Sequence, residues 1–274
     1  MDKEDEKLIY ELLLKVKQNK KYSTISDEIV IKEIKKYLIK TPVTNISKMD
    51  ISLIRKSLHR LYSSYQTKKK NKREKYLEEL KHDLTNKEII NKLLCVTVST
   101  TERLEDYSTL YIKIFDITGL PKSITDLGSG LNPLSYPYMG VKKLDYYAFD
   151  IDNSDIDFLN KYFEIAKPLG INGKAGILDV QNLKEVSYIP GTDVIFMFKL
   201  IDLIDKKHDK TSEELIKLLL EKTKFVVASF STKTLTRKPM KLPRRKGFEL
   251  MLERNNLKYK VLELKNEIFY IISK

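Results

Sequence analysis

Three aspartates in the middle of the chain could surround one ligand. Asp126 lies just before Gly128 and Gly130, and Asp150 and Asp179 each follow a short apolar run. Glycines let a backbone turn sharply and approach a ligand, because no Cβ intrudes. Carboxylates at neighbouring strand ends can accept ribose hydroxyls or an exocyclic amine. We therefore predict a nucleoside site, although each aspartate taken alone could equally cap a turn.

The elements that must position these aspartates are apolar strands alternating with helices. The predicted strands cover residues 122–127, 146–149, 175–178, 194–198 and 225–229, and helices are predicted up to about residue 167 and over 213–223. This alternation indicates a parallel sheet with helices on both faces. Two last strands, 258–264 and 268–272, are joined by residues 265–267. That link is too short for a parallel crossover, so one strand of the pair must run antiparallel.

The amino-terminal third shows helical periodicity only. Apolar residues at helical spacing predict amphipathic helices over 4–18, 27–38 and 47–65. Capping boxes at Thr85-x-x-Glu88 and Ser99-x-x-Glu102 predict the starts of two more helices. We therefore divide the chain into a helical domain, residues 1–84, and an α/β domain, residues 85–274.

The net charge of +13 is concentrated in two segments. Residues 41–75 carry a net +8 and residues 231–246 a net +7, so the rest of the chain sums to −2. Clustered positive charge indicates a polyanion such as RNA, although two solvated lysine-rich surfaces are the alternative. The candidate RNA contacts are Arg55, Lys56, His59, Arg60, Lys68, Lys69, Lys70, Lys233, Arg237, Lys238, Arg244 and Arg245.

Composition excludes several other kinds of site. The single cysteine, Cys95, excludes an internal disulfide, and the three scattered histidines do not provide a structural zinc cluster. No apolar run approaches the roughly 18 residues of a membrane span, and the amino terminus is highly charged. We expect a cytoplasmic, metal-free, monomeric protein.

Two features decide between nucleotide-binding folds. Pro133 occupies the position of the third small residue in an NAD-type Rossmann motif, and that fold does not end in an antiparallel pair of strands. Both features are typical of a class I S-adenosylmethionine-dependent methyltransferase, a Rossmann-like seven-stranded sheet whose last strand is reversed. Further evidence comes from six segments: 99–104, 126–134, 147–152, 198–200, 229–235 and, more faintly, 58–65. They resemble the aminoglycoside-resistance 16S rRNA methyltransferases of the Arm/Rmt type. Members of that family methylate ring nitrogen 7 of guanine 1405 in the decoding site.

The resemblance assigns roles to individual residues. It implies that Arg103 pairs with the methionine carboxylate of S-adenosylmethionine, that Asp150 holds the ribose hydroxyls, and that Asp179 with the Val180 backbone holds the adenine. Lys199 would position the target base, and the basic residues would grip rRNA phosphates in the 30S subunit. The implied cofactor site is completed by Asp126, Gly128, Gly130, Ile151, Phe198 and Leu200.

The same resemblance implies a mechanism and leaves other functions open. Guanine nitrogen 7 already carries a lone pair, so catalysis would be mainly positioning, with the base made accessible by flipping. Asp202 and Asp205 are candidates for stabilising the cationic product. Because Ser129, Ser231 and the basic loop 236–247 depart from the family pattern, another rRNA guanine is an alternative target. A non-catalytic ribosome-assembly factor and a small-molecule methyltransferase are the remaining alternatives, and the latter leaves both basic clusters unexplained.

Overall fold

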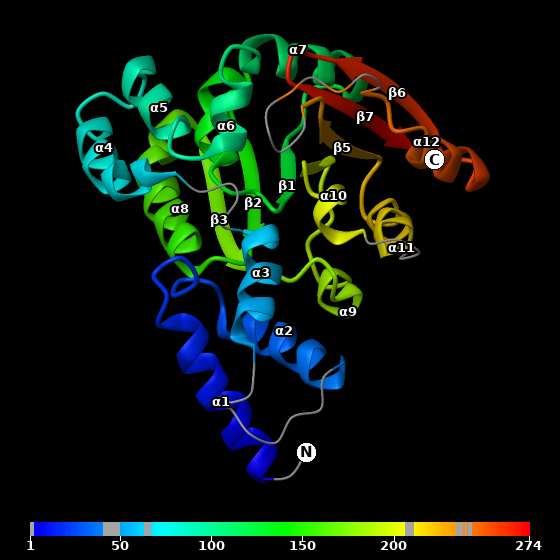
Figure 1. Ribbon diagram of the computed structural model, residues 1–274. Helices are drawn as coiled ribbons and strands as arrows, with labels where there is room; N and C mark the ends of the chain where they lie inside the picture. The colour runs from blue at the N-terminus through cyan, green and yellow to red at the C-terminus, as the bar shows by residue number, and fades with distance from the viewer. Residues whose placement is uncertain are drawn as a thin grey trace. The chain divides into compact units, whose positions relative to one another are not determined.

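The computed structural model describes residues 3–40, 50–62, 67–205, 211–233, 238, 240 and 243–274, which divide into two compact units (Figure 1). The helical unit comprises Met1–Gln66 with Ile151–Ser154, and the sheet unit comprises Thr67–Asp150 with Asp155–Lys274. The division thus falls before residue 67 and not at the predicted residue 84. The reason is that Leu77 and Leu80 are buried in the same core as the sheet.

The helical unit contains the three amphipathic helices that the periodicity predicts. They are α1 (Lys3–Lys17), α2 (Asp27–Lys40) and α3 (Ile51–Leu61). Their apolar faces share one core, in which Leu12, Ile34 and Leu58 are fully buried. The side chain of Asp50 caps α3 by accepting a hydrogen bond of 2.9 Å from the Ser52 amide. The outer parts of the predicted 47–65 helix lie outside the described residues.

A short segment from the middle of the chain completes the helical unit. The Ser26 amide donates to the carbonyl of Ile151 at 2.9 Å, and Ile25 forms an isolated antiparallel bridge with Asp152. Asp152 is fully buried and accepts a hydrogen bond from the Thr24 hydroxyl. It is therefore a structural residue of this unit.

The sheet unit begins with helices and continues with strands and helices in alternation. Its first part contains η3 (Lys68–Lys72), α4 (Arg73–Leu80), α5 (Lys87–Leu94), α6 (Val98–Arg103), α7 (Tyr107–Thr118), β1 (Ser123–Leu127), η4 (Asn132–Tyr138), β2 (Leu144–Asp150), α8 (Asn153–Ala166), η5 (Lys167–Leu169) and β3 (Ile171–Ile177). Its second part contains α9 (Leu183–Val186), β4 (Val194–Phe198), α10 (Ile201–Ile204), α11 (Thr211–Leu219), β5 (Phe225–Ser231), α12 (Lys246–Arg254), β6 (Lys258–Glu263) and β7 (Glu267–Ser273).

The seven strands form one sheet in the order β3-β2-β1-β4-β5-β7-β6. Strand β7 is antiparallel to both β5 and β6, whereas the pairs among β1 to β5 are parallel. This confirms the predicted fold class, a seven-stranded sheet with its last strand reversed. One boundary was wrong: Glu267 was assigned to the link before the last strand, but it is the first residue of β7.

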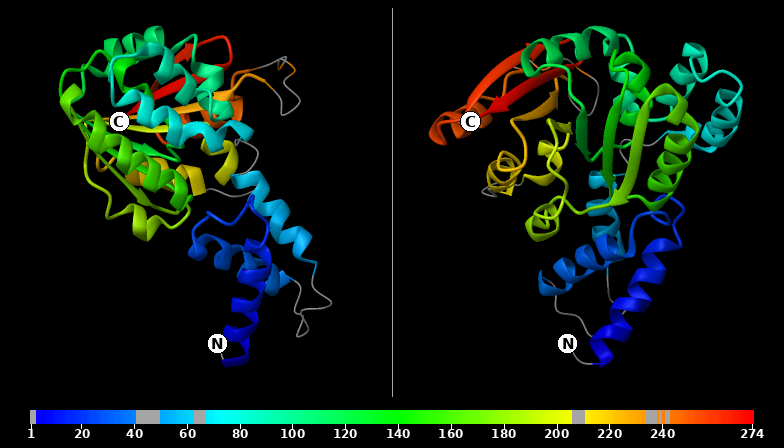
Figure 2. Two further views of the ribbon diagram at one scale, coloured as in Figure 1. Left: turned by 90° about the vertical axis from the view of Figure 1, so that its left-hand side faces the viewer. Right: turned by 180° about the vertical axis from the view of Figure 1, so that it is seen from behind.

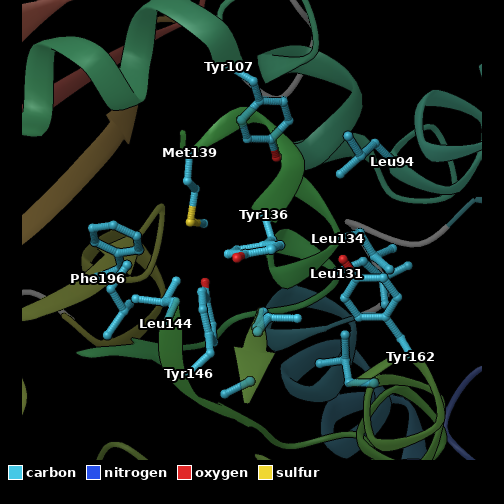
Figure 3. Close-up of a cluster of buried hydrophobic side chains, with 14 of the residues drawn as sticks. Leu94, Tyr107, Leu131, Leu134, Tyr136, Met139, Leu144, Tyr146, Tyr162 and Phe196 are labelled. Carbon is cyan, nitrogen blue, oxygen red and sulfur yellow. The ribbon is translucent and has the colours of Figure 1, made fainter. Parts of the chain in front are cut away.

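Both faces of the sheet are covered because its central strands are apolar on both sides. Phe196 and Phe198 of β4 point into a core shared with α4, α5, α7 and α8, part of which appears in Figure 3. Ile195 and Met197 alternate with them and point into a second core, shared with α10, α11 and α12. The helices on the two sides can be followed in the views from the side and from behind (Figure 2).

Both helix starts predicted from capping boxes need correction. Helix α5 is capped by Asn86, whose side chain accepts hydrogen bonds from the amides of Glu88 and Ile89, and not by Thr85. Helix α6 begins at Val98 after Thr97, so Ser99 lies inside the helix. Asparagine is as good a helix cap as serine or threonine, and a four-residue pattern does not select between adjacent candidates.

Candidate functional site

The carboxyl ends of the central strands meet at one edge of the sheet, beside the point where the strand order reverses between β1 and β4. Leu127 pairs with Phe149, and Asp150 pairs with Ile177, so β1, β2 and β3 end in register. Open α/β sheets bind ligands at such a reversal. The predicted site residues therefore belong to one edge.

The turn after β1 requires both of its glycines for different reasons. Gly128 has φ +64° and Gly130 has φ +49°, a left-handed conformation that other residues rarely adopt. A Cβ on Gly128 would lie 2.9 Å from Leu200 Cδ1, whereas a Cβ on Gly130 would meet no atom within 4 Å. The Gly130 amide donates to Asp150 Oδ2 at 2.8 Å, which ties this turn to the end of β2.

Asp126 is a buried carboxylate with one oxygen unused. Its Oδ2 accepts hydrogen bonds from the Tyr146 hydroxyl at 2.7 Å and from Asn132 Nδ2 at 2.9 Å. Its Oδ1 is also buried and has no hydrogen-bond partner. Burial raises the pKa of Asp126 to about 6, against the lowering effect of both hydrogen bonds and of the Arg103 charge. Buried polar atoms without a hydrogen-bond partner are uncommon in folded proteins, so Oδ1 is a candidate functional atom.

Arg103, at the end of α6, is held in a polar cluster and is only 3% exposed. Its Nε donates to Glu267 Oε2 at 2.9 Å, and its Nη1 donates to Asn132 Oδ1 at 2.8 Å. Nη2 makes no hydrogen bond to any residue that the structure describes, and the guanidinium carbon lies 5.0 Å from the centre of the Phe198 ring. Although burial alone would lower it, the nearby Glu267 carboxylate raises the pKa of Arg103 above its ordinary value.

Lys199 follows β4 directly and is buried rather than exposed at the lip of the site. It has φ +56°, and its Nζ lies 2.5 Å from Glu102 and 3.3 Å from Glu267. Its backbone amide donates to the Ser229 hydroxyl oxygen at 2.9 Å, and the Ser229 hydroxyl in turn donates to Glu267. Lys199 and Arg103 therefore share one buried carboxylate, that of Glu267, which is 1% exposed.

The remaining predicted cofactor residues lie directly after β2 and β3 and at or after the end of β4. Asp179 is half-buried, and its Oδ1 accepts a hydrogen bond from the Gln181 amide at 3.0 Å. Val180 and Leu200 are buried in one core, and Phe198 is buried in the other. Ile151 differs from the rest, because it packs in the core of the helical unit.

The predicted RNA contacts differ in exposure. Lys56, His59 and Arg60 of α3 are exposed, as are Lys69 and Lys238. The exposed Arg244 pairs with Glu249, and three less exposed side chains also have protein partners: Arg55 donates to the Lys15 carbonyl, Lys70 pairs with the buried Asp155, and Arg245 bonds to Asp202 and the Ser231 carbonyl. The backbone amide of Lys233 donates to the Ser231 hydroxyl oxygen. Arg237 and the side chain of Lys68 lie outside the described residues.

The two candidate carboxylates for stabilising the product already have partners. Asp205 accepts hydrogen bonds from the amide and the hydroxyl of Ser212, and Asp202 pairs with Arg245 at 3.1 Å. Neither contact indicates a role in catalysis. Among the described residues, no group of three or more His, Cys, Asp or Glu side chains could hold a metal ion, and no helix is long and apolar enough to cross a membrane.

Sequence reasoning missed Glu267, Asn132, Tyr107 and Ser229, which build the cluster around Arg103. Tyr107 donates to Asn132 Oδ1 at 3.2 Å, and burial raises its pKa to about 12. Arg103 and Glu267 are separated by 164 residues, so no local pattern could pair them. The one available signal was Asn132 itself, an amide directly after a glycine turn.

Comparisons with known proteins identify the family and the fold. Residues 18–271 match the family model described as ribosomal RNA methyltransferase (FmrO). A 16S rRNA (guanine(1405)-N(7))-methyltransferase from Proteus mirabilis is 31% identical over 99% of both chains. Two solved structures share the fold. The 16S rRNA methyltransferase RmtF, in complex with S-adenosyl-L-homocysteine, is 19% identical and matches with a TM-score of 0.79 over 100% of this chain and 99% of its own. The 16S rRNA methylase RmtB is 20% identical and matches with a TM-score of 0.70 over 97% and 98%. The chain therefore belongs to the FmrO family of ribosomal RNA methyltransferases.

Proposed function

We propose that this protein transfers a methyl group from S-adenosylmethionine to ring nitrogen 7 of guanine 1405 in 16S rRNA. The observation that carries the proposal is that Arg103, Asp126 and Asp150 lie around one edge of the sheet, with unused hydrogen-bonding capacity on the first two. The nucleotide is supported by the relative from Proteus mirabilis, which is named for this reaction and aligns over 99% of both chains. The natural substrate particle would be the 30S subunit.

The residues present fit S-adenosylmethionine. Arg103 Nη2 can donate to a carboxylate, and the buried Oδ1 of Asp126 can accept from an ammonium group. Asp150 can accept from ribose hydroxyls, and the open space beside Gly130 leaves room for a ligand. Asp179 and the Val180 backbone follow β3, where they can bind the adenine.

The chain's own contribution to the reaction is positioning. When bound, S-adenosylmethionine supplies an electrophilic methyl group on a sulfonium centre. No residue needs to act as a general base, because guanine nitrogen 7 already carries a lone pair. Lys199, fixed by Glu102 and Glu267, would organise the edge of the site that the target base enters. The exposed Lys56, His59 and Lys69 would bind phosphates and hold the RNA in register.

The proposal is tested by incubating the protein with 30S subunits and methyl-labelled cofactor, and then mapping the modified nucleotide. We expect label at guanine 1405, and we expect Asp150→Ala to lower cofactor affinity by about 10- to 100-fold, since two charge-assisted hydrogen bonds are lost. Expression of the unmodified protein in a sensitive bacterium should allow growth on gentamicin or kanamycin, whereas expression of Asp150→Ala should not.

Two outcomes would overturn the proposal. Label on a different nucleotide would refute the target but leave the methyltransferase intact. Binding of rRNA without binding of the cofactor, and with neither 30S subunits nor naked 16S rRNA labelled, would instead identify a non-catalytic RNA-binding protein.

A further inference from the structure

Asn132 occupies the centre of the buried polar cluster, between Arg103 and Asp126. It is 1% exposed and is the first residue of η4. Its Oδ1 accepts from Arg103 Nη1 at 2.8 Å and from the Tyr107 hydroxyl at 3.2 Å. Its Nδ2 donates to Asp126 Oδ2 at 2.9 Å and lies 3.5 Å from the Tyr146 hydroxyl. Both acceptor positions and both donor protons of the amide are therefore used.

The chemistry at this position requires an amide. A side chain here must accept from a cation at one end and donate to an anion at the other. Aspartate has no proton to donate when ionised and would place a second carboxylate beside Asp126, whereas an aliphatic residue would leave both Arg103 and Asp126 with unpaired buried groups. Asn132 also separates the guanidinium from the carboxylate, which attract each other across it.

That separation leaves a matched pair of unused groups. Arg103 retains Nη2, and Asp126 retains its buried, unpartnered Oδ1. A cation and an anion held apart in this way are complementary to an α-amino-acid zwitterion, whose carboxylate and ammonium group are joined to one carbon. A direct Arg103–Asp126 ion pair would neutralise both groups and remove this complementarity.

We propose that Asn132 is a positioning residue that holds Arg103 and Asp126 apart as the two poles of a receptor for the amino-acid end of the cofactor. This inference depends on the proposed cofactor, and it extends that proposal by assigning a role to a residue outside the predicted cofactor and RNA contacts.

The test compares two ligands that differ only at the amino-acid end. S-adenosylhomocysteine carries the zwitterion, whereas 5′-methylthioadenosine carries the same adenosine and sulfur without it. We expect Asn132→Asp in the full-length protein to weaken S-adenosylhomocysteine binding by about 10- to 100-fold in calorimetry and to leave 5′-methylthioadenosine binding within about 2-fold. Tyr107→Phe removes one donor to Asn132, so it should also weaken S-adenosylhomocysteine binding selectively, but by less. It serves as the second variant if Asn132→Asp does not fold.

The matched control is Tyr136→Phe. The Tyr136 hydroxyl donates to the carbonyls of Val141 and Leu169 and has no hydrogen bond to Asn132 or to either pole. This control should bind both ligands as the unmodified protein does. Equal weakening of both ligands by Asn132→Asp would show a purely structural role and overturn the inference. Failure of the unmodified protein to bind either ligand would refute the proposed function itself.

Discussion

Asp126 makes the free protein less stable at neutral pH than an uncharged residue would. Its pKa is raised to about 6 by burial, so between about pH 4 and pH 6 the folded protein holds this proton more tightly than the unfolded chain does. The contribution of Asp126 to the free energy of unfolding therefore falls as the pH rises through that window, and it stays low above it. A shift of this size corresponds to about 3 kcal/mol.

Asp126→Asn should consequently stabilise the free protein at pH 8 and have little effect at pH 4.5. Asparagine can still accept from Tyr146 and Asn132 through its Oδ1, while the buried charge is removed. The measurement is the melting temperature of the variant and of the unmodified protein at both pH values. Asp116→Asn, on the exposed face of α7, is the control for a general charge effect. If Asp126→Asn were equally destabilised at both pH values, the raised pKa of Asp126 and its destabilising charge would be contradicted.

Sequence reasoning singled out candidate residues of the site but not the residues that hold them. Arg103, Asp126 and Asp150 could be predicted because each belongs to a short motif next to a recognisable element. Glu267 could not, because its partners Arg103 and Lys199 are distant in the chain, and a lone glutamate near a turn indicates solvent exposure. The burial of Lys199 was missed for the same reason, since its partner carboxylates come from α6 and β7.

At the scale of elements, the two glycines of the turn between β1 and η4 should affect stability and ligand binding differently. Gly128→Ala should destabilise the fold by about 1–2 kcal/mol from its left-handed backbone alone, and more from the contact with Leu200. Gly130→Ala should carry only the backbone cost, because its Cβ would enter open space. If that space receives the cofactor, Gly130→Ala should lower cofactor affinity more than its small loss of stability suggests.

Chemical denaturation and calorimetry on both variants check this prediction. The result that would contradict it is a Gly130→Ala protein that binds S-adenosylhomocysteine as well as the unmodified protein does.

Strand and helix types were predictable from periodicity, whereas their boundaries were not. Strand β4 was predicted over the residues it occupies, because a short, fully apolar run is typical of a central strand. Strand β3 begins at Ile171, four residues earlier than predicted, since Asn172 and Lys174 interrupt the apolar pattern with exposed side chains. An alternating strand at the edge of a sheet is weaker evidence than a continuous apolar run.

At the scale of the whole molecule, the net charge overstates the surface available to RNA. Lys70 and Arg73 neutralise the buried Asp155, and Arg244 and Arg245 pair with Glu249 and Asp202. Composition reveals the excess of cationic residues, but it cannot show which of them form ion pairs within the folded protein.

Lys56→Ala and Lys69→Ala should each weaken binding to 16S rRNA similarly for all sequences, because phosphate contacts carry no base information. Each should also reduce the dependence of log affinity on log salt by roughly one unit. Filter binding across a salt series gives both values. Lys113→Ala removes the same charge from an exposed position on α7 and should change neither. An unchanged salt slope in both lysine variants would show that these residues do not contact phosphate.

The segment Ile151–Ser154 has a consequence for how this enzyme can be dissected. The polypeptide leaves the sheet unit immediately after Asp150 and returns at Asp155, so no single cleavage releases either unit intact. A fragment without residues 1–66 would lose the Ser26 amide from Ile151 and the Thr24 hydroxyl from the buried Asp152. The loss would fall on the residues that directly follow Asp150 in the chain. Removal of residues 1–66 therefore takes away more than the amino-terminal helices, because it also removes the partners of residues 151 and 152.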